Sequence, residues 1–364
     1  MIMQQVSSSS LFGSGQRQLV AAPRSLRRSS RMGSAPRCQA PQPTPRRLPL
    51  PPAAAMVEAP LAPPETKQND SEQALVRFGF PKGSLQKSTE DLFARAGFKV
   101  KISERGYFPK CDDPQLQMVL FRSQEISRYV EDGVLDAGIC GYDWIVENGA
   151  DVVEVCELPY SKATSKPACW VLAVPESSPV QQPEDLAGTI VASELVNTTR
   201  RFFDERGIAV KKVEYSWGAT EVKASLPGVG GIVDITETGS SLKANNLRVV
   251  STILASATRL VANKAAWADP AKRTKIEDVA LLLQGAIVGK EKVGLKMNLH
   301  RDQLEEVSKL LPSERSPTIS QLVDSGFVAV EVIVDKSQAR DLIPTCKRLG
   351  ATGIVVYNVD VIIH

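Results

Sequence analysis

The chain is organised around Gly230–Leu247, which reads Gly-Gly-Ile-Val-Asp-Ile-Thr-Glu-Thr-Gly-Ser-Ser-Leu-Lys-Ala-Asn-Asn-Leu. An apolar run broken by glycines at residues 229–233 predicts the end of a buried strand, and helix-compatible residues follow from Leu242. A helix start offers backbone N–H groups and the positive end of the helix dipole. This strand–turn–helix order therefore predicts a binding site for a phosphate monoester.

Acidic and hydroxyl side chains fill the turn of this stretch. The carboxylates of Asp234 and Glu237 repel phosphate, but they fit ribose hydroxyls or a Mg²⁺ ion carried by pyrophosphate. A phosphate, a sugar diol and a metal-bound pyrophosphate together describe phosphoribosyl pyrophosphate. The candidate ligands for it are Asp234, Thr236, Glu237, Thr238, Gly239, Ser240 and Ser241. An ordinary helix N-cap without a ligand is the alternative, but the density of acids and hydroxyls favours the ligand.

The N-terminal part of the chain has the composition of an organelle transit peptide. Residues 1–57 contain eight arginines but no Asp, Glu or Lys, and are rich in Ser, Ala, Gln and Pro. We expect residues 1–70 to be a disordered transit peptide and linker, and the Ser- and Pro-rich, weakly amphipathic character favours the chloroplast over the mitochondrion. A basic tail that binds nucleic acid is the alternative, but no aromatic residues are interleaved to stack on bases.

The charge of the remaining chain argues against nucleic acid as a partner. The whole chain carries +3, from 44 basic and 41 acidic residues. Without the eight arginines of the leader, 36 basic residues face 41 acidic ones, which gives about −5. A protein with this balance has no global basic field for nucleic acid. The sequence also lacks an apolar run long enough to cross a membrane.

Cysteine and histidine usage limits the possible chemistry. The six cysteines show no paired spacing, so neither a zinc site nor a disulfide framework is indicated. The chain has only two histidines, which leaves little for a Ser-His-Asp mechanism or a histidine-built metal site. Catalysis would therefore depend on carboxylates, cations, dipoles and positioning.

Strand and helix patterns alternate through the middle of the chain, which predicts an α/β fold with two lobes and a cleft. We assign residues 71–160 with 250–287 to the first lobe and residues 161–249 to the second. A lysine-containing glycine turn at residues 81–85 follows the first predicted strand. A lysine at this end of a strand fits a phosphate or carboxylate partner, and a solvated loop lysine is the alternative. A second hydroxyl-rich helix start, with Ser193, Thr198 and Thr199, is another candidate anion site, and simple N-capping is its alternative.

The last part of the chain follows a different plan. Residues 288–364 read as strand, helix, two strands, helix and strand, which predicts a ferredoxin-like βαββαβ domain. A small sheet with one bare face often binds a small molecule or a second copy of itself.

Five motifs, each weak alone, are together highly specific and span nearly all of the chain after the leader. They are Pro-Lys-Gly-Ser-Leu (81–85), Asp-Ala-Gly-Ile-Cys-Gly-Tyr-Asp (136–143), Gly-Ala-Thr-Glu-Val-Lys (218–223), Asp-Ile-Thr-Glu-Thr-Gly-Ser-Ser-Leu-Lys-Ala-Asn (234–245) and Ser-Pro-Thr-Ile (316–319). With these motifs the chain resembles the long form of ATP phosphoribosyltransferase, the first enzyme of histidine biosynthesis.

This resemblance implies a fold and a reaction. The fold has two lobes like those of periplasmic binding proteins and a C-terminal ACT-like domain that binds histidine as a feedback inhibitor. In the reaction, N1 of ATP displaces Mg²⁺-pyrophosphate from C1 of phosphoribosyl pyrophosphate. The resemblance also implies a homo-oligomer, between a dimer and a hexamer.

The resemblance assigns roles to residues that match its motifs. The candidate catalytic residues are Asp234, Glu237 and Lys82. Mg²⁺ arrives with pyrophosphate, and Asp234 is a candidate protein ligand for it. The candidate ATP-binding residues are Gly83, Ser84, Leu85, Gly141, Asp143, Ser193, Thr198 and Thr199. Asn298 and Thr318 are placed near the inhibitor histidine.

Two other functions fit parts of the sequence. A plastid prephenate dehydratase-like enzyme also joins a binding-protein-like region to an ACT domain, and Asn197–Phe202 faintly matches its signature. That enzyme handles no phosphate, so the hydroxyl cluster at residues 238–241 would have no role. A non-catalytic ligand-binding regulatory subunit is the second alternative. Turnover of ATP with phosphoribosyl pyrophosphate separates all three.

Overall fold

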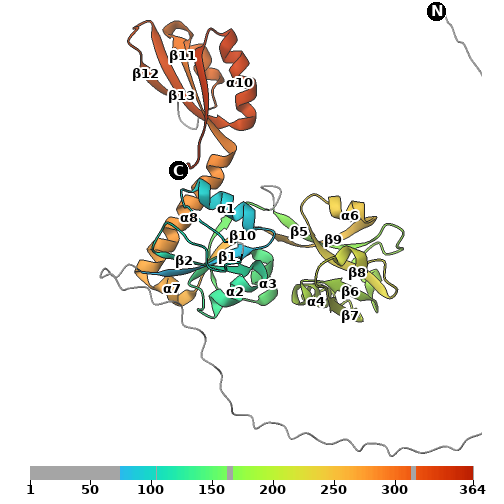
Figure 1. The fold of residues 1–364 in the computed structure, drawn as a ribbon. Helices are drawn as coiled ribbons and strands as arrows, with labels where there is room; N and C mark the ends of the chain where they lie inside the picture. The colour runs from blue at the N-terminus through green and yellow to red at the C-terminus, as the bar shows by residue number, and fades with distance from the viewer. Residues whose placement is uncertain (1–73, 104, 162–166, 313–316, 364) are drawn as a thin grey trace, which may run out of the picture. The chain divides into compact units, whose positions relative to one another are not determined.

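The fold is that of a computed structural model, which describes residues 74–103, 105–161, 167–312 and 317–363. The predicted transit peptide and linker, residues 1–70, lie outside these residues. The described residues form three β-sheets with helices packed on them (Figure 1).

The first sheet has the strand order β2-β1-β3-β10-β4. Strand β1 is parallel to β2 and β3, whereas β10 is antiparallel to β3 and β4. Its strands are β1 (Val76–Lys82), β2 (Leu116–Arg122), β3 (Ala137–Gly141), β4 (Val153–Leu158) and β10 (Thr258–Ala262). The apolar side chains of β2, β3 and β10 alternate between two cores, so that both faces of the sheet are buried.

Helices cover both faces of the first sheet. Side chains of α1 (Gln86–Arg95) and α8 (Pro270–Glu291) form one core, and side chains of α2 (Ser123–Glu131) and α3 (Tyr142–Asn148) form the other. The short helix α7 (Lys264–Ala268) precedes α8. Asp269 caps α8 by accepting from the N–H groups of Ala271 and Lys272, and Pro270 begins the helix.

The second sheet repeats the same topology with the order β7-β6-β8-β5-β9. Here β6, β7 and β8 are parallel and β5 is antiparallel to β8 and β9. Its strands are β5 (Ala168–Pro175), β6 (Ile190–Ser193), β7 (Lys212–Tyr215), β8 (Val229–Thr236) and β9 (Leu247–Ser256). The short helices are η1 (Pro183–Leu186), α4 (Val196–Asp204), α5 (Thr220–Lys223) and α6 (Ser240–Ala244). The two lobes are thus built on the plan of periplasmic binding proteins, as the resemblance implied.

One predicted boundary between the lobes is wrong. The strand pattern of the sequence predicts that the chain returns to the first lobe at residue 250. In the structure β9 pairs with β5 of the second sheet along its whole length, from Leu247 to Ser256. The chain therefore passes to the first sheet at Ala257, between β9 and β10. An alternating strand pattern identifies a strand but not the sheet that it joins.

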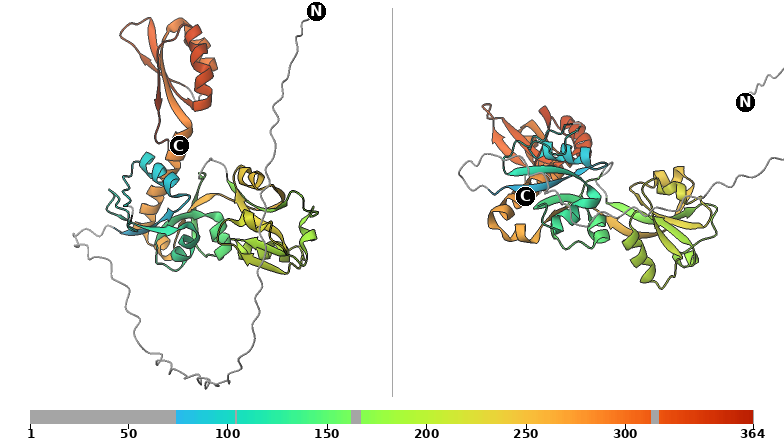
Figure 2. Two further views of the ribbon diagram at one scale, coloured as in Figure 1. Left: turned by 45° about the vertical axis from the view of Figure 1, so that its right-hand side comes forward. Right: turned by 60° about the horizontal axis from the view of Figure 1, so that its bottom comes forward.

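The third sheet is antiparallel and has the order β12-β13-β11-β14. Its elements are β11 (Lys292–His300), η2 (Arg301–Gln303), α9 (Leu304–Leu310), β12 (Thr318–Gln321), β13 (Phe327–Asp335), α10 (Lys336–Arg348) and β14 (Thr352–Asn358). This order confirms the predicted ferredoxin-like βαββαβ plan. Helices α9 and α10 cover one face of this sheet (Figure 2). Leu295, Met297 and Val330 are buried on that face.

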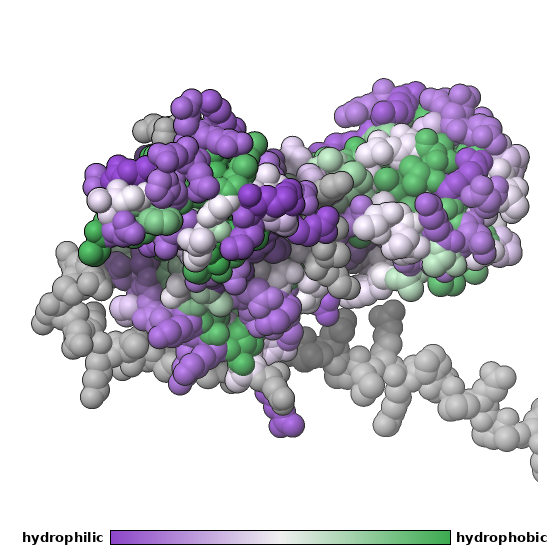
Figure 3. Space-filling model, turned by 90° about the horizontal axis from the view of Figure 1, so that it is seen from above, coloured by the Kyte–Doolittle hydropathy of each residue, from purple (hydrophilic) through white to green (hydrophobic). Residues whose placement is uncertain are grey.

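Among the described helices, none combines the length and the apolar composition needed to cross a bilayer. The face drawn in Figure 3 carries many hydrophilic residues, with apolar residues in smaller groups between them.

Candidate active site

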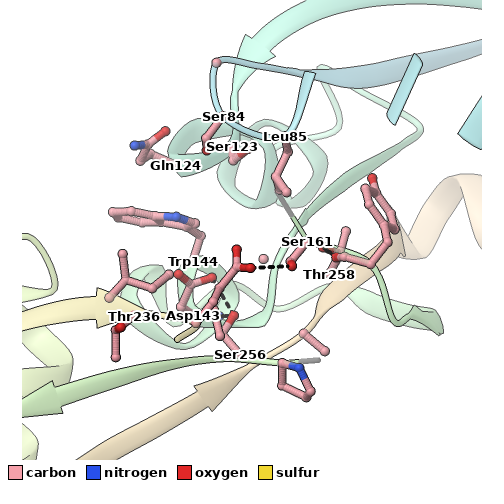
Figure 4. A pocket seen from close by; sticks show the side chains of 18 of the residues that line it. Ser84, Leu85, Ser123, Gln124, Asp143, Trp144, Ser161, Thr236, Ser256 and Thr258 are labelled. Carbon is pink, nitrogen blue, oxygen red and sulfur yellow. Dashed lines mark hydrogen bonds between the residues drawn. The ribbon is translucent and has the colours of Figure 1, made fainter. Parts of the chain in front are cut away.

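A pocket of about 640 Å³ lies where residues of the first and second sheets meet (Figure 4). First-sheet segments supply the turn after β1, the start of α2, the start of α3 and the chain after β4. Second-sheet segments supply the turn after β8 and the start of β5. The lining residues are Lys82, Gly83, Ser84, Leu85, Arg122, Ser123, Gln124, Gly141, Asp143, Trp144, Pro159, Tyr160, Ser161, Pro167, Ala168, Ile235, Thr236, Glu237, Thr238, Ser240, Ser241, Ser256, Ala257 and Thr258.

The turn after β1 is held in place by hydrogen bonds to α1 and to the chain after β4. Gly83 has a φ of +104°, a backbone conformation that favours glycine, and it carries the chain from Lys82 into α1. The Thr89 hydroxyl donates to the Leu85 carbonyl at 2.8 Å, and its oxygen lies 2.7 Å from the Tyr160 hydroxyl. Lys82 is exposed, with its Nζ 4.2 Å from the centre of the Tyr107 ring. An exposed cation thus stands on a turn that is held by hydrogen bonds.

The start of α3 brings a buried carboxyl to the pocket. Asp143 accepts hydrogen bonds from Trp170 Nε1 and Ser256 Oγ, each at 2.8 Å. Burial raises the pKa of this carboxyl, and the two donors act in the opposite direction. Gly141 precedes it, and a Cβ at that position would lie only 2.0 Å from Asp143 Oδ1. The close approach explains why glycine stands there.

The turn between β8 and α6 forms the second-lobe wall of the pocket. Gly239 has a φ of +75° and its N–H donates to Thr236 Oγ1 at 2.8 Å. The hydroxyl groups of Thr238, Ser240 and Ser241 are exposed. Glu237 accepts a hydrogen bond from Ser161 Oγ at 2.9 Å, which crosses to the segment after β4. The structure therefore brings the predicted hydroxyl turn and the predicted lysine turn to one pocket.

Asp234 does not line this pocket. It lies two residues before Thr236 on β8, is half-buried, and accepts from the Ile235 N–H at 2.8 Å. Burial raises its pKa to about 6, with further contributions from the nearby charges of Glu221 and Glu194. Gly239 is also absent from the lining, although it shapes the turn.

The second predicted anion site is filled by the protein itself. The carboxylate of Glu147, on α3, accepts hydrogen bonds from the backbone and hydroxyl of Thr198. The Thr199 hydroxyl donates to Ser193 Oγ at 2.9 Å, which in turn accepts from the Leu195 N–H at 3.0 Å. Ser193, Thr198 and Thr199 do not line the pocket, and the anion at this helix start is the Glu147 side chain.

Several lining residues are not among the site residues predicted from the sequence. Arg122 adds a second cation at the exit of β2, beside Ser123 and Gln124. Trp144 adds an aromatic ring, and Ser256 comes from the end of β9. The position of Arg122 at the carboxyl end of a parallel strand is a signal that could have identified it. Ser256 gave no such signal, because only the pairing of distant strands brings it to Asp143.

The two residues assigned to histidine lie on the uncovered face of the third sheet. Asn298 of β11 pairs with Ala329, whereas Thr318 of β12 pairs with Glu331. They thus share a face but lie on different rows of the sheet, with β13 between them. Tyr357 donates a hydrogen bond to Glu331 on the same face.

The described residues hold no group of three or more His, Cys, Asp and Glu side chains suited to a metal ion. Of the two predicted acids, Glu237 lines the pocket and Asp234 does not. One carboxylate beside hydroxyl groups fits Mg²⁺, because Mg²⁺ usually keeps several waters and binds through one or two carboxylates plus substrate phosphates.

Known proteins match nearly all of the described chain. A family model described as ATP phosphoribosyltransferase matches residues 122–285, and one described as HisG, C-terminal domain, matches residues 289–361. The ATP phosphoribosyltransferase of Chlorobaculum parvum is 53% identical over 290 residues, covering 79% of this chain and 98% of the relative. The chain belongs to the ATP phosphoribosyltransferase family. That membership decides against the prephenate dehydratase-like alternative.

Other members of the ATP phosphoribosyltransferase family agree. The protein of that name from Pelotomaculum thermopropionicum is 54% identical over 288 residues, which is 79% of this chain and 99% of the relative. A solved structure, the ATP phosphoribosyl transferase (HisG:HisZ) complex from Thermotoga maritima, matches with a TM-score of 0.51 and 24% identity. It covers 59% of this chain and 99% of the solved chain, and at this identity it supports the fold alone.

Proposed function

We propose that the protein transfers the phosphoribosyl group of phosphoribosyl pyrophosphate to N1 of ATP, as the first step of histidine biosynthesis. The observation that carries this proposal is the agreement of family and site. Two of the motifs on which the resemblance rests supply both walls of one pocket, the lysine turn at residues 82–85 and the hydroxyl turn at residues 236–241. The second of them lies within the residues that the family model matches.

The two substrates fit opposite walls of the pocket. The turn after β8 suits the 5′-phosphate and ribose, because Thr238, Ser240 and Ser241 present hydroxyl groups at the start of α6. The first-lobe wall suits ATP, because Trp144 can stack on a base while Lys82 and Arg122 neutralise phosphates. In this arrangement N1 of adenine faces C1 of the ribose across the pocket.

The reaction suits the side chains present. N1 of adenine forms a bond to C1 as the bond from C1 to the pyrophosphate oxygen breaks, and the electron pair leaves with pyrophosphate. Such a transition state has oxocarbenium character and needs no strong base. Alignment of the two substrates can contribute on the order of 7–11 kcal/mol. Lys82 and Arg122 are the cations that would stabilise the leaving group.

Mg²⁺ is the proposed cofactor. It would neutralise the departing pyrophosphate, and Glu237 would hold it. The other pocket carboxyl, Asp143, is buried and accepts from Trp170 and Ser256. Glu237 replaces Asp234 as the candidate ligand, because Asp234 lies outside the lining.

We further propose that histidine inhibits the enzyme by binding the uncovered face of the third sheet, near Asn298 and Thr318. A homo-oligomer is also proposed, since Ile319, Ile333 and Val355 of this domain expose 41–53% of their surface.

The composition of residues 1–57 supports import into the chloroplast. A fluorescent protein fused to residues 1–70 should enter plastids in leaf cells, and diffuse cytosolic fluorescence would contradict this assignment.

The decisive experiment is a turnover assay with the protein lacking residues 1–70. We expect phosphoribosyl-ATP to form from ATP and phosphoribosyl pyrophosphate in the presence of Mg²⁺. Its formation is measured by ultraviolet absorbance. Binding of both substrates without product would favour the regulatory subunit. Absence of both binding and product would overturn the proposal.

A further inference from the structure

The N-terminus of α4 is capped by a carboxylate from the other lobe. Its own N-cap residue is Leu195, whose side chain has no acceptor. Glu147 of α3 instead accepts from the backbone N–H groups of Asn197 at 2.9 Å and Thr198 at 2.8 Å, and from Thr198 Oγ1 at 2.8 Å. Only 8% of Glu147 is exposed. These are the N–H groups that an N-cap side chain normally takes, and the helix dipole favours an anion there.

Further hydrogen bonds join the same two helix ends. The side-chain amide of Asn197 donates to the Glu147 carbonyl at 3.1 Å. The Arg201 guanidinium donates to the Val146 carbonyl at 2.6 Å and to Thr198 Oγ1 at 3.4 Å. The last turn of α3 is therefore bound to the first turn of α4 through both backbone and side chains.

The opposite end of α3 is also held by second-sheet residues. Trp170 of β5 and Ser256 of β9 both donate to the Asp143 carboxyl, and the rings of Trp144 and Trp170 lie edge to face with centres 6.5 Å apart. Asp143 and Trp144 are the pocket residues of this helix (Figure 4). By chain order α3 belongs to the first lobe, yet both of its ends are fastened to the second.

We propose that Glu147 is a positioning residue for phosphoribosyl transfer. By capping α4 it holds α3, and with it Asp143 and Trp144, at a fixed place opposite the turn at residues 236–241. This inference rests on the proposed function, because it takes the ATP wall and the phosphoribosyl turn to lie on different lobes. The relative position of the two lobes then determines the distance and the angle at which N1 of ATP approaches C1 of the ribose.

The first test is Glu147→Gln, which keeps the size of the side chain but removes its charge and turns an NH₂ group toward backbone donors. A displaced reactant costs rate, so we expect kcat to fall by about 10- to 100-fold. The KM for phosphoribosyl pyrophosphate should stay within about twofold, because the turn that holds its 5′-phosphate lies wholly in the second lobe. Glu205→Gln is the matched control, since Glu205 is exposed at the other end of α4.

A double-mutant cycle tests whether the effect passes through α4. Thr198→Val removes one bond to Glu147 and should lower kcat by a smaller factor than Glu147→Gln, whereas Thr198→Ser keeps the hydroxyl and should restore kcat. The double variant Glu147→Gln with Thr198→Val should be no slower than Glu147→Gln alone. Additive losses would show that the residues act separately and would overturn the inference. So would a rise in both KM values at unchanged kcat.

Hydrogen exchange gives a readout that does not need turnover. In Glu147→Gln the amides of residues 142–149 and 196–199 should exchange faster together, while those of α10 should not change. Faster exchange in α4 alone would mean that Glu147 caps that helix without holding α3, and would overturn the inference. If the wild-type protein shows no turnover, but Glu147→Gln still raises the exchange of both segments together, the proposed function is refuted. The connection between the two lobes would then still stand.

Discussion

Asp234 lies just before the hydroxyl turn, and its pKa is shifted into the range that a kinetic pH profile covers. Burial raises its pKa from the ordinary value of 3.8 to about 6. Between about pH 4 and pH 6 the folded protein therefore holds a proton that the unfolded chain has released. The resulting contribution to stability is lost as the pH rises through this window. Above pH 6 the carboxylate is ionised, and it accepts from the Ile235 N–H at the start of the turn that forms the second-lobe wall.

We predict that kcat/KM for phosphoribosyl pyrophosphate falls as the pH drops below about 6. The Asp234→Asn variant should have a low kcat/KM at every pH between 5 and 8. Its kcat/KM should not depend on pH through this group, because the amide does not titrate. A pH profile of kcat/KM from pH 5 to pH 8 measures both effects.

Histidine binding serves as the control for Asp234→Asn. It should be unchanged in this variant, because the third sheet contains neither Asp234 nor its neighbours. Equal losses in the two binding reactions would indicate misfolding, and an unchanged pH dependence would exclude Asp234 from substrate binding.

At the scale of secondary-structure elements, the turn from β8 to α6 depends on one backbone conformation. Gly239 has a φ of +75°, and nothing within 4 Å would obstruct a Cβ there. The strain of a substitution is thus one of backbone conformation, about 1–2 kcal/mol for a residue with a side chain. Gly207, at the end of α4, has a φ of +66° and equally open surroundings. The two glycines therefore differ only in what their turns do.

We predict that Gly239→Ala and Gly207→Ala destabilise the protein by similar amounts, about 1 kcal/mol. Only Gly239→Ala should also raise the KM for phosphoribosyl pyrophosphate, by about tenfold, because it turns the hydroxyl cluster away from the 5′-phosphate. Thermal unfolding and steady-state kinetics of both variants test this. Equal KM values in the two variants would remove the turn from the substrate site.

At the scale of the whole molecule, the proposed inhibition by histidine requires that the third sheet influences a pocket built by the other two. Helix α8 connects the first sheet to the third, since it packs in the first core and leads directly into β11. The C-terminal segment returns to this helix, where the Ile362 N–H donates to the Gly285 carbonyl at 3.0 Å. Gly285 and Gly289 allow this approach, because a Cβ on either would meet residues 360–363 at 2.5–2.7 Å.

We predict that Asn298→Ala raises the histidine concentration needed for half-inhibition by about tenfold, roughly the 1.4 kcal/mol of one lost hydrogen bond. The uninhibited kcat should not change, because Asn298 lies outside the pocket. Ser337→Ala, on exposed α10, is the control. Unaltered inhibition in Asn298→Ala would place the histidine site elsewhere.

Sequence alone determined those features that depend on neighbours along the chain. The run from Gly230 to Leu247 specified strand, turn and helix, because apolar periodicity and glycine positions are local properties. The order of elements after residue 288 specified the third sheet for the same reason. The hydroxyl turn and the lysine turn could each be identified as candidate anion sites, although nothing local showed that they share a pocket.

Tertiary structure decided the features that join distant segments. It assigned β9 to the second sheet, brought Ser256 to Asp143, and left Asp234 outside the lining. It also placed Glu147 at the start of α4, where the sequence predicted a ligand. The physical reason is that a helix N-terminus favours any anion. Only the packing of the two lobes determines which anion occupies it.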